Sequence, residues 1–302
     1  MSAQFLIDGF VAGAMIGLGA IGVTLTYSIL RFANFAHGEF MTFGAYAALL
    51  LAAAIAALIA GSDAAIGRLS IDGALALALV PAMAMTAALA VALDHVLFRR
   101  LRGKGAAISM VMASFGASMA LRAMLEFAFT SRPAYFSREL QIAMPIGFGL
   151  RVTPDAIALL LGAAGLLVLL HALLTRTQIG RTMRAVAENP MLARVAGVDV
   201  DKTIRAVWIL GGALACASGV MLGLLVQIRP FMGFDLLLPL FAAAILGGIG
   251  SVPGAFVGAL IVGVAEAAAV QFVGAQWRDA VAFVVLIAVL ILKPTGLFGR
   301  GN

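Results

Sequence analysis

The segment FLIDGFVAGAMIGLGAIGVTLTYSIL, residues 5–30, has a single charged side chain, Asp8, in an otherwise apolar run. An α-helix needs about 20 apolar residues to cross the hydrocarbon core of a bilayer, and this run exceeds that length. The whole chain shares this character, because 63% of its 302 residues are hydrophobic and 11% are charged. Soluble domains contain about 45–50% apolar and about 25% charged residues. The sequence therefore predicts an integral membrane protein made of transmembrane helices.

Comparable apolar runs continue along the chain. We predict spans at residues 5–30, 38–60, 73–98, 106–129, 153–174, 204–228, 235–248, 253–273 and 279–292. The seventh and ninth runs are short and the second begins in a polar stretch, so we expect eight or nine helices. The predicted fold class is an all-α, polytopic transmembrane helix bundle, with one domain over residues 1–302 and a long loop at residues 175–203.

The basic residues predict which end of the bundle faces the cytoplasm. Residues 98–104, residues 175–205 and the C-terminal tail hold 12 positive charges, whereas the opposite loops hold six. Cytoplasmic loops are enriched in Lys and Arg, so the first group is expected inside. With nine spans, the N-terminus would then lie outside and the C-terminus inside. The formal net charge of +6 thus reflects topology. No basic patch with interleaved aromatics occurs, so a nucleic-acid partner is not expected.

Small residues recur at every fourth position in three places, a pattern that lets helix backbones approach closely. The three stripes are Gly9, Gly13 and Gly17; Gly211, Ala215, Gly219 and Gly223; and Gly250, Gly254 and Gly258. They predict tight packing, and the sequence leaves open whether they also provide smooth surfaces on which helices slide.

Ionisable residues at membrane depth are costly and are therefore candidates for function. Ser114, Ser118, Arg122 and Glu126 share one face of the predicted fourth span, and an Arg122–Glu126 pair near the outer interface is about as plausible as a pathway role. Glu266 continues the third small-residue stripe, so it should face the protein interior. There it could line a pathway or accept hydrogen bonds from a neighbouring helix.

The sequence RFANFAHGE, residues 31–39, interrupts two apolar runs with Asn34, His37, Gly38 and Glu39. Irregular backbone at membrane depth is tolerated only where it is buried in protein or lines a cavity. In transporters such breaks often mark a substrate region or a gate. We predict irregular, buried backbone over residues 34–39, with Asn34 and His37 hydrogen-bonded inside the protein; a simple turn between helices is the alternative.

Several chemistries have no sequence signature here. There is no phosphate-binding G-x-x-x-x-G-K-[ST] loop, the three histidines lack metal-site spacing, and no G-x-S-x-G turn occurs. The single cysteine, Cys216, cannot form an internal disulfide. We therefore expect no catalytic residues, no metal and no bound cofactor.

The inner loop TRTQIGRTMRAVAENPMLARVAGVDVDKT, residues 175–203, looks helical from residue 180 to 195. Pro190 breaks this stretch, and Gly197 should end the second piece as a C-terminal cap. Two short helices with an Ala/Val face in a cytoplasmic loop need a surface on which to dock.

This loop resembles the coupling loop of ABC importer permeases, in which a short helix sits in a groove of the ATP-binding subunit. Residues 34–39, NFAHGE, resemble a signature of the branched-chain amino acid importer permeases. Residues 244–255, AILGGIGSVPGA, are similar to that family's late glycine-rich segment, Glu266 follows as expected, and residues 293–299, KPTGLFG, resemble its C-terminal ending. The four motifs occur in the family's order and cover nearly the whole chain.

The resemblance implies a permease subunit in the bacterial inner (cytoplasmic) membrane. It would receive a small polar solute, with branched-chain or other apolar amino acids favoured, from a periplasmic binding protein. A second homologous permease and two ATP-binding cassette subunits are the implied partners, and those subunits would bind and hydrolyse the ATP. The implied contacts to the ATPase are Arg184, Glu188, Asn189, Ala193 and Gly197. Candidates for a substrate pathway or gate are Asn34, His37, Glu39, Ser114, Ser118 and Glu266.

Other functions remain open at this point. The same permease group also serves urea, amides, and small carboxylic or aromatic acids. An ion-coupled secondary transporter should have paired, similarly interrupted helices and buried carboxylates near the midplane, whereas the sequence indicates one clear interruption. An intramembrane enzyme is disfavoured because no nucleophile–base spacing is present.

Overall fold

The computed structural model describes residues 3–59, 61–62, 66, 69–102, 107–137, 141–147, 150–293 and 295–299. Within these residues, eight helices are long and apolar enough to cross a membrane. They are α1 (Gln4–Leu30), α2 (His37–Leu58), Gly73–Leu101, α5 (Ala107–Phe129), α6 (Pro154–Arg176), α9 (Val200–Leu225), α12 (Val252–Phe272) and Ala275–Leu292. The prediction of an all-α polytopic bundle is therefore confirmed.

Two of these spans are composite. The third begins as α3 (Gly73–Leu93), continues through a π-helical turn (Asp94–Phe98) and ends as α4 (Arg99–Leu101). The last consists of a 3-10 turn (Ala275–Trp277) followed by α13 (Arg278–Leu292). The short run predicted at residues 235–248 folds as α10 (Met232–Asp235) and α11 (Leu237–Gly247).

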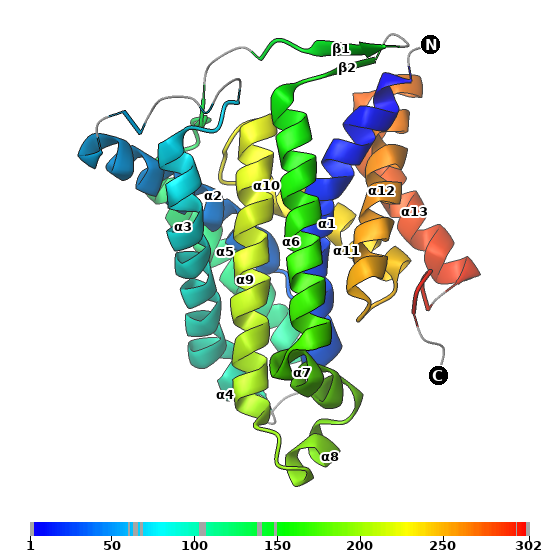
Figure 1. Ribbon diagram of the computed structural model, residues 1–302. Helices are drawn as coiled ribbons and strands as arrows, with labels where there is room; N and C mark the ends of the chain where they lie inside the picture. The colour runs from blue at the N-terminus through cyan, green and yellow to red at the C-terminus, as the bar shows by residue number, and fades with distance from the viewer. Residues whose placement is uncertain are drawn as a thin grey trace.

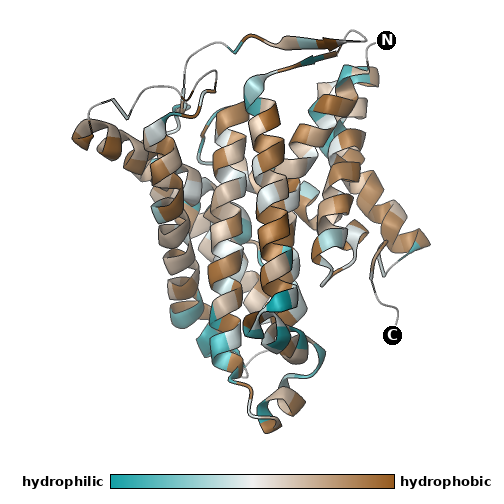
Figure 2. Cartoon of the chain, viewed as in Figure 1, coloured by the Kyte–Doolittle hydropathy of each residue, from teal (hydrophilic) through white to brown (hydrophobic). Residues whose placement is uncertain are grey.

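The two ends of the bundle carry different elements, and hydrophilic residues gather at both ends with largely apolar helices between them (Figures 1 and 2). The outer end, as the charge distribution predicts it, carries the start of α1 and the antiparallel pair β1 (Met144–Gly147) and β2 (Leu150–Val152). The inner end carries α4 and two short helices, α7 (Gln178–Glu188) and α8 (Pro190–Val195). The two long basic stretches therefore share one end, as predicted.

The seam between α1 and α12 is a close contact of backbone against backbone. A Cβ on Gly13 would lie 2.7 Å from the Leu260 Cα, and one on Gly263 would lie 2.5 Å from the Gly13 nitrogen. Backbones that approach this closely leave room for no side chain at the crossing. In the third stripe, Gly258 packs against α11 instead of α1. A Cβ on Gly258 would lie 2.8 Å from the Gly247 nitrogen. The predicted role of these stripes in packing is confirmed.

Two breaks interrupt the helices inside the bundle. The first covers residues 31–36, between the end of α1 and the start of α2, and Arg31 adopts a left-handed conformation with φ of 56°. The second covers residues 226–236, where α10 is the only helical turn between α9 and α11. The second break meets the start of α2, just after the first break, where Gly38 faces Gly233 and the Gly233 N–H donates to the Thr42 hydroxyl at 3.1 Å.

Two predictions about these breaks need correction. Irregular backbone is found over residues 34–36, but His37, Gly38 and Glu39 form the first turn of α2. The prediction of a single clear interruption is also wrong, because residues 226–236 form a second one. Its sequence, VQIRPFMGFDL, is largely apolar, so hydropathy alone assigned its first residues to a span. Pro230 and Gly233 are the local signals for the break.

Candidate functional site

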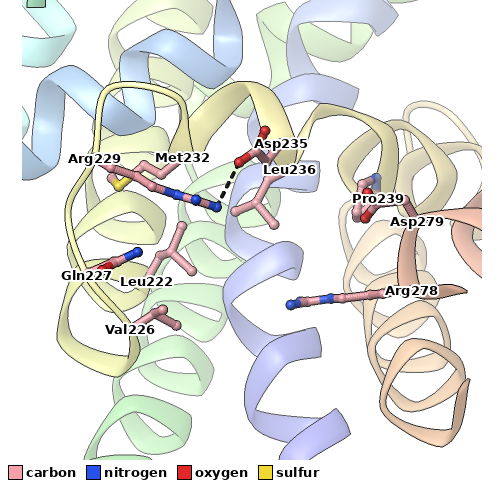
Figure 3. A pocket seen from close by; sticks show the side chains of 10 residues that line it. All are labelled: Leu222, Val226, Gln227, Arg229, Met232, Asp235, Leu236, Pro239, Arg278 and Asp279. Atoms are coloured by element: carbon pink, nitrogen blue, oxygen red, sulfur yellow. Dashed lines mark hydrogen bonds and ion pairs between the residues drawn. The ribbon is translucent and has the colours of Figure 1, made fainter. Parts of the chain in front are cut away.

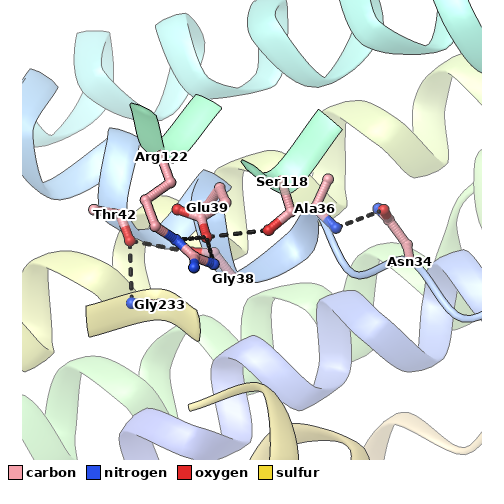
Figure 4. Close-up of polar contacts among 8 residues, drawn as sticks. All are labelled: Asn34, Ala36, Gly38, Glu39, Thr42, Ser118, Arg122 and Gly233. Atoms are coloured by element: carbon pink, nitrogen blue, oxygen red, sulfur yellow. Dashed lines mark hydrogen bonds and ion pairs between the residues drawn. The ribbon is translucent and has the colours of Figure 1, made fainter. Parts of the chain in front are cut away.

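The candidate site lies where the two breaks meet α5, and Glu39 is at its centre (Figure 4). This carboxylate is fully buried, at 0% exposure. Its Oε1 accepts from Arg122 Nη2 at 2.7 Å and Nε at 3.1 Å, and from the Ser118 hydroxyl at 3.1 Å. A buried carboxylate held by a guanidinium and a hydroxyl is a charge-assisted network that α2 and α5 share.

Arg122 also reaches the second break. Its guanidinium carbon lies 4.1 Å from the centre of the Phe234 ring and 5.0 Å from that of Phe231, which are cation–π distances. One side chain on α5 therefore contacts both the start of α2 and the segment around α10. We call Glu39, Ser118, Arg122, Phe231 and Phe234 the Glu39 network.

The predicted Arg122–Glu126 pair is not formed. Glu126 instead accepts from the Ser131 hydroxyl at 2.7 Å at the exposed end of the helix. Spacing of four residues puts the Arg122 and Glu126 side chains on one face of α5, but Glu39 is a fully buried carboxylate, and Arg122 is its ion-pair partner among the described residues. A buried charge without a partner costs more than an exposed one, so Arg122 pairs with Glu39.

The break itself is anchored by the inner part of the same face of α5. The Ser114 hydroxyl accepts from the Phe35 N–H at 3.1 Å and donates to the Val111 carbonyl at 2.7 Å. Asn34 Oδ1 accepts from the Ala36 N–H at 3.1 Å and so closes the turn before α2. The prediction that Asn34 is buried and hydrogen-bonded inside the protein is confirmed.

His37 is buried against α1 and occupies space that a glycine leaves free. A Cβ on Gly22 would lie 2.6 Å from the His37 Cε1, and among the described residues the buried His37 Nε2 has no hydrogen-bond partner. The structure thus brings Asn34, His37, Glu39, Ser114 and Ser118 together around the first break, as one cluster of the predicted pathway residues.

Glu266 stands apart from this cluster. It is 2% exposed, and its Oε2 accepts from Arg278 Nε at 2.9 Å, which joins α12 to α13. The prediction that Glu266 faces the protein interior is confirmed, and its pairing supports the reading as an acceptor for a neighbouring helix.

The loop at the inner end forms the two short helices that the sequence predicts. Asn189 ends α7 and caps α8, accepting from the N–H groups of Met191 and Leu192 at 3.0 Å each. Gly197 ends α8 with a φ of 83°. Its N–H donates to the Arg194 carbonyl, and the Val198 N–H donates to the Ala193 carbonyl, which is the Schellman arrangement of a helix end. Both ends of α8 are thus fixed by the local sequence.

The orientation of α8 differs from the expectation for Ala193. That residue is 5% exposed and faces its own chain, so it is not the docking surface. The exposed apolar side chains are Met191, Leu192 and Val195, at 71%, 66% and 85%. The sequence analysis did not single out these three residues. Once Ala193 is known to face the protein, the helical periodicity of α8 leaves them on its exposed side. We call these three residues the α8 tip.

The other predicted loop residues have distinct surroundings. Arg184 donates from Nη1 to the Leu174 carbonyl at 2.5 Å near the end of α6, while Glu188 is exposed. Arg31, at the first break, donates from Nη2 to the Ala187 carbonyl at 2.5 Å and so joins that break to the end of α7. At the start of α9, the Lys202 N–H donates to the Asp199 carboxylate, which lowers the pKa of that exposed acid.

The two late sequence motifs contact each other. Gly248 and Gly250 have positive φ angles of 96° and 91° in the turn between α11 and α12. Near this turn, the Leu297 and Phe298 N–H groups donate to the Leu246 and Gly247 carbonyls at 2.8 Å and 3.1 Å. The C-terminal tail therefore satisfies carbonyl groups that the end of α11 leaves open.

The chain matches a family of known transport proteins. The family model described as "Branched-chain amino acid transport system / permease component" matches residues 5–290. The high-affinity branched-chain amino acid transport system permease protein LivH of Escherichia coli (strain K12) is 32% identical over 311 residues, covering 99% of this chain and 98% of that protein. The corresponding permease protein BraD of Pseudomonas aeruginosa is 32% identical over 306 residues, covering 98% and 95%.

A shorter match extends beyond this group. The autoinducer 2 import system permease protein LsrC of Klebsiella pneumoniae is 36% identical over 128 residues, covering 40% of this chain and 37% of that protein. The family match over residues 5–290 and the nearly full-length likeness to LivH decide the assignment. The chain belongs to the family of permease components of branched-chain amino acid transport systems.

Proposed function

We propose that this chain is the membrane-spanning subunit of an ATP-driven importer that carries branched-chain or other apolar amino acids across the bacterial inner membrane. A periplasmic binding protein delivers the amino acid at the outer end. A second, homologous permease completes the translocation path, and two ATP-binding cassette subunits dock at the inner end. The chain itself binds no ATP and performs no catalysis.

The observation that carries this proposal is the α8 tip. Met191, Leu192 and Val195 expose apolar surface on a rigidly capped helix in a loop that also carries Arg181 and Arg194. Apolar side chains gathered outside the membrane are typical of a protein contact. A groove on an ATP-binding subunit would cover them.

Contacts inside the chain support a route from this loop to the first break. Arg31 ties the end of α7 to residues 31–36, and those residues lead directly into the Glu39 network. A displacement of α7 by the ATPase would therefore pull on the segment that holds α5. The route consists of named hydrogen bonds, so each step can be broken separately.

The substrate class is tested by uptake into proteoliposomes. The complex is assembled from this chain, the proposed partner permease, the two ATPase subunits and the binding protein. We expect ATP-dependent accumulation of labelled leucine, with isoleucine and valine competing, and no effect of urea or acetamide. Uptake that is driven by an ion gradient without ATP, or that prefers urea, amides or organic acids, contradicts the proposal.

The docking role is tested by Leu192→Asp, with Leu192→Met as the matched control. The acidic variant should assemble poorly with the ATPase subunits, and ATP hydrolysis should no longer respond to the loaded binding protein; the methionine variant should behave like the wild type. Ala193→Arg is a poorer test, because an arginine at that buried position would disrupt the loop itself. Full coupling in a correctly inserted Leu192→Asp complex would exclude α8 as the docking surface.

A further inference from the structure

A cavity opens at the outer end of the bundle, between the end of α9, α10 and the start of α13 (Figure 3). It lies where the chain turns back into the membrane at the second break. Four charged side chains line it: Arg229, Asp235, Arg278 and Asp279. Two positive and two negative groups give the lining no net charge.

The two arginines have donors to spare. Arg229 uses Nη2 to bond Asp235 Oδ2 at 2.9 Å, and Arg278 uses Nε to bond Glu266 at 2.9 Å. A guanidinium carries five N–H donors, so each has further donors for a carboxylate. The side chains of Arg229 and Arg278 are 49% and 46% exposed, which keeps them accessible from the cavity.

The remaining wall is mostly aliphatic. Leu222, Val226, Met232 and Leu236 line the cavity together with Pro239, and Gln227 adds one polar amide. Such a wall suits a branched aliphatic group and offers no aromatic stacking platform. The cavity thus combines cations, anions and an aliphatic wall.

We infer that this cavity is a receiving subsite for an apolar amino acid in its zwitterionic form. The α-carboxylate lies between Arg229 and Arg278, the α-ammonium faces Asp235 and Asp279, and the aliphatic side chain rests on the Leu222–Leu236 side. This inference rests on the proposed function and names the chemistry by which the permease accepts what the binding protein releases.

The balance of charge gives the site its selectivity. A zwitterion can satisfy both signs at once, whereas a carboxylic acid or an amine leaves one pair of lining charges without a partner. A lining charge left without a partner loses a favourable contact, which solvent partly screens at these half-exposed positions, so ligands with one charge should bind more weakly. A neutral solute such as urea forms neither ion pair.

The cavity is also next to the Glu39 network. The short helix α10 presents Asp235 to the cavity, while the preceding residue, Phe234, stacks on Arg122. A ligand that attracts Asp235 therefore acts on the helical turn that contacts α5. Occupation of the cavity and the state of the network are linked through one turn of backbone.

The binding chemistry is tested on the intact complex in nanodiscs, without the binding protein, using the photoreactive leucine analogue that carries a diazirine. Labelled peptides are located by mass spectrometry in the presence of three competitors. We expect labelling of residues 222–239 and 278–279, protection by leucine, and about tenfold weaker protection by 4-methylpentanoate and by 3-methylbutylamine. Labelling elsewhere, or equal protection by all three compounds, overturns the inference.

Two variants separate this inference from the proposed function. Val226→Trp fills the cavity from a side chain that is 60% exposed, so folding should be retained. Asp235→Asn removes one charge while keeping its shape. Both should raise the leucine concentration for half-maximal labelling about tenfold, whereas Glu126→Gln, at the same end but outside the cavity, should not.

Uptake measurements complete the distinction. If the wild-type complex fails to import leucine with its binding protein, the proposed function fails. If it imports leucine and both cavity variants label and transport as the wild type does, only the subsite is wrong.

Discussion

The contact between α1 and α12 and the contact between α5 and the two breaks hold helices together in opposite ways. In the most apolar window of α1, 72% of the residues are buried within the chain, compared with 17% for α5. Glycine stripes bring the backbones of α1 and α12 together. On α5, by contrast, the buried side chains are Ser114, Ser118 and Leu125, so two of the three are polar.

This difference assigns different mechanical roles to the two regions. A seam of backbone against backbone has no alternative arrangement nearby, because any shift opens gaps or produces clashes. An ion pair, two hydroxyl hydrogen bonds and two cation–π contacts can break and re-form with little change in packed volume. We therefore regard α1 and α12 as part of a fixed frame and α5 as a separable element held by the Glu39 network.

Arg122→Met should have the largest effect on the α5 contact. It leaves Glu39 buried without its cation, and breaking a buried pair in this way costs about 3–5 kcal/mol. The free energy of unfolding in mild detergent, followed by titration with a denaturing detergent, measures this loss. Hydrogen exchange should rise in α5 and residues 31–39 while α1 and α12 stay protected.

The double variant Arg122→Met with Glu39→Gln provides the control for that result. Removing the charge of the partner should recover at least half of the lost stability, because no unpaired charge remains. Transport should not recover, since the reversible ion pair is gone. A double variant no more stable than Arg122→Met would show that the pair is not what holds α5.

Gly13→Ala should have the next largest effect, on the frame. Its Cβ would lie 2.7 Å from the Leu260 Cα, a backbone atom that cannot move alone. Overpacking of this kind costs about 1–3 kcal/mol. The matched control is Gly116→Ala on α5, where no atom lies within 4 Å of the new Cβ. Equal midpoints of thermal unfolding for the two variants would contradict the tight seam.

Ser114→Ala and Ser218→Ala compare one hydrogen bond in each region, since both serines are fully buried. Ser114 accepts from the Phe35 N–H, whereas Ser218 donates to the Met15 carbonyl of α1 at 2.7 Å. Each change should cost about 1 kcal/mol. Only Ser114→Ala should increase hydrogen exchange in residues 31–36; a similar increase in Ser218→Ala would remove the distinction between the regions.

Glu126→Gln should have the smallest effect. The pair of Glu126 with Ser131 is exposed at the outer end of α5, and such surface interactions contribute at most about 0.5 kcal/mol. Unfolding and uptake should match the wild type. A loss as large as that of Arg122→Met would mean that α5 is anchored at its outer end instead of at Glu39.

The sequence predicted the parts of the structure that depend on local composition. Apolar runs located the spans, Pro190 and Gly197 located the ends of the short loop helices, and polar density located the first break. Each of these signals acts within a few residues, where capping and hydropathy dominate.

The predictions were wrong where contacts with a distant part of the chain determine the local structure. Arg122 pairs with Glu39, 83 residues away, and not with Glu126 one turn along the helix. The second break was missed because hydropathy placed residues 226–228 and 235–236 in spans, and the contact of Gly233 with Gly38 joins parts of the chain that lie far apart in sequence. The direction of α8 depends on packing of Ala193 against its own chain, which no pattern within the loop specifies.

The most direct test of the division into a frame and a separable α5 is a pair of distance measurements by double electron–electron resonance. Spin labels at the exposed positions Met119 on α5 and Ile261 on α12 form one pair, and labels at Phe10 on α1 and Ile261 form the other. The complex carries Cys216→Ala and is compared without nucleotide and trapped with ATP and vanadate. The account predicts that the distance from Met119 to Ile261 shifts between the two states while that from Phe10 to Ile261 stays unchanged. A shift of the second distance with a constant first one would contradict it.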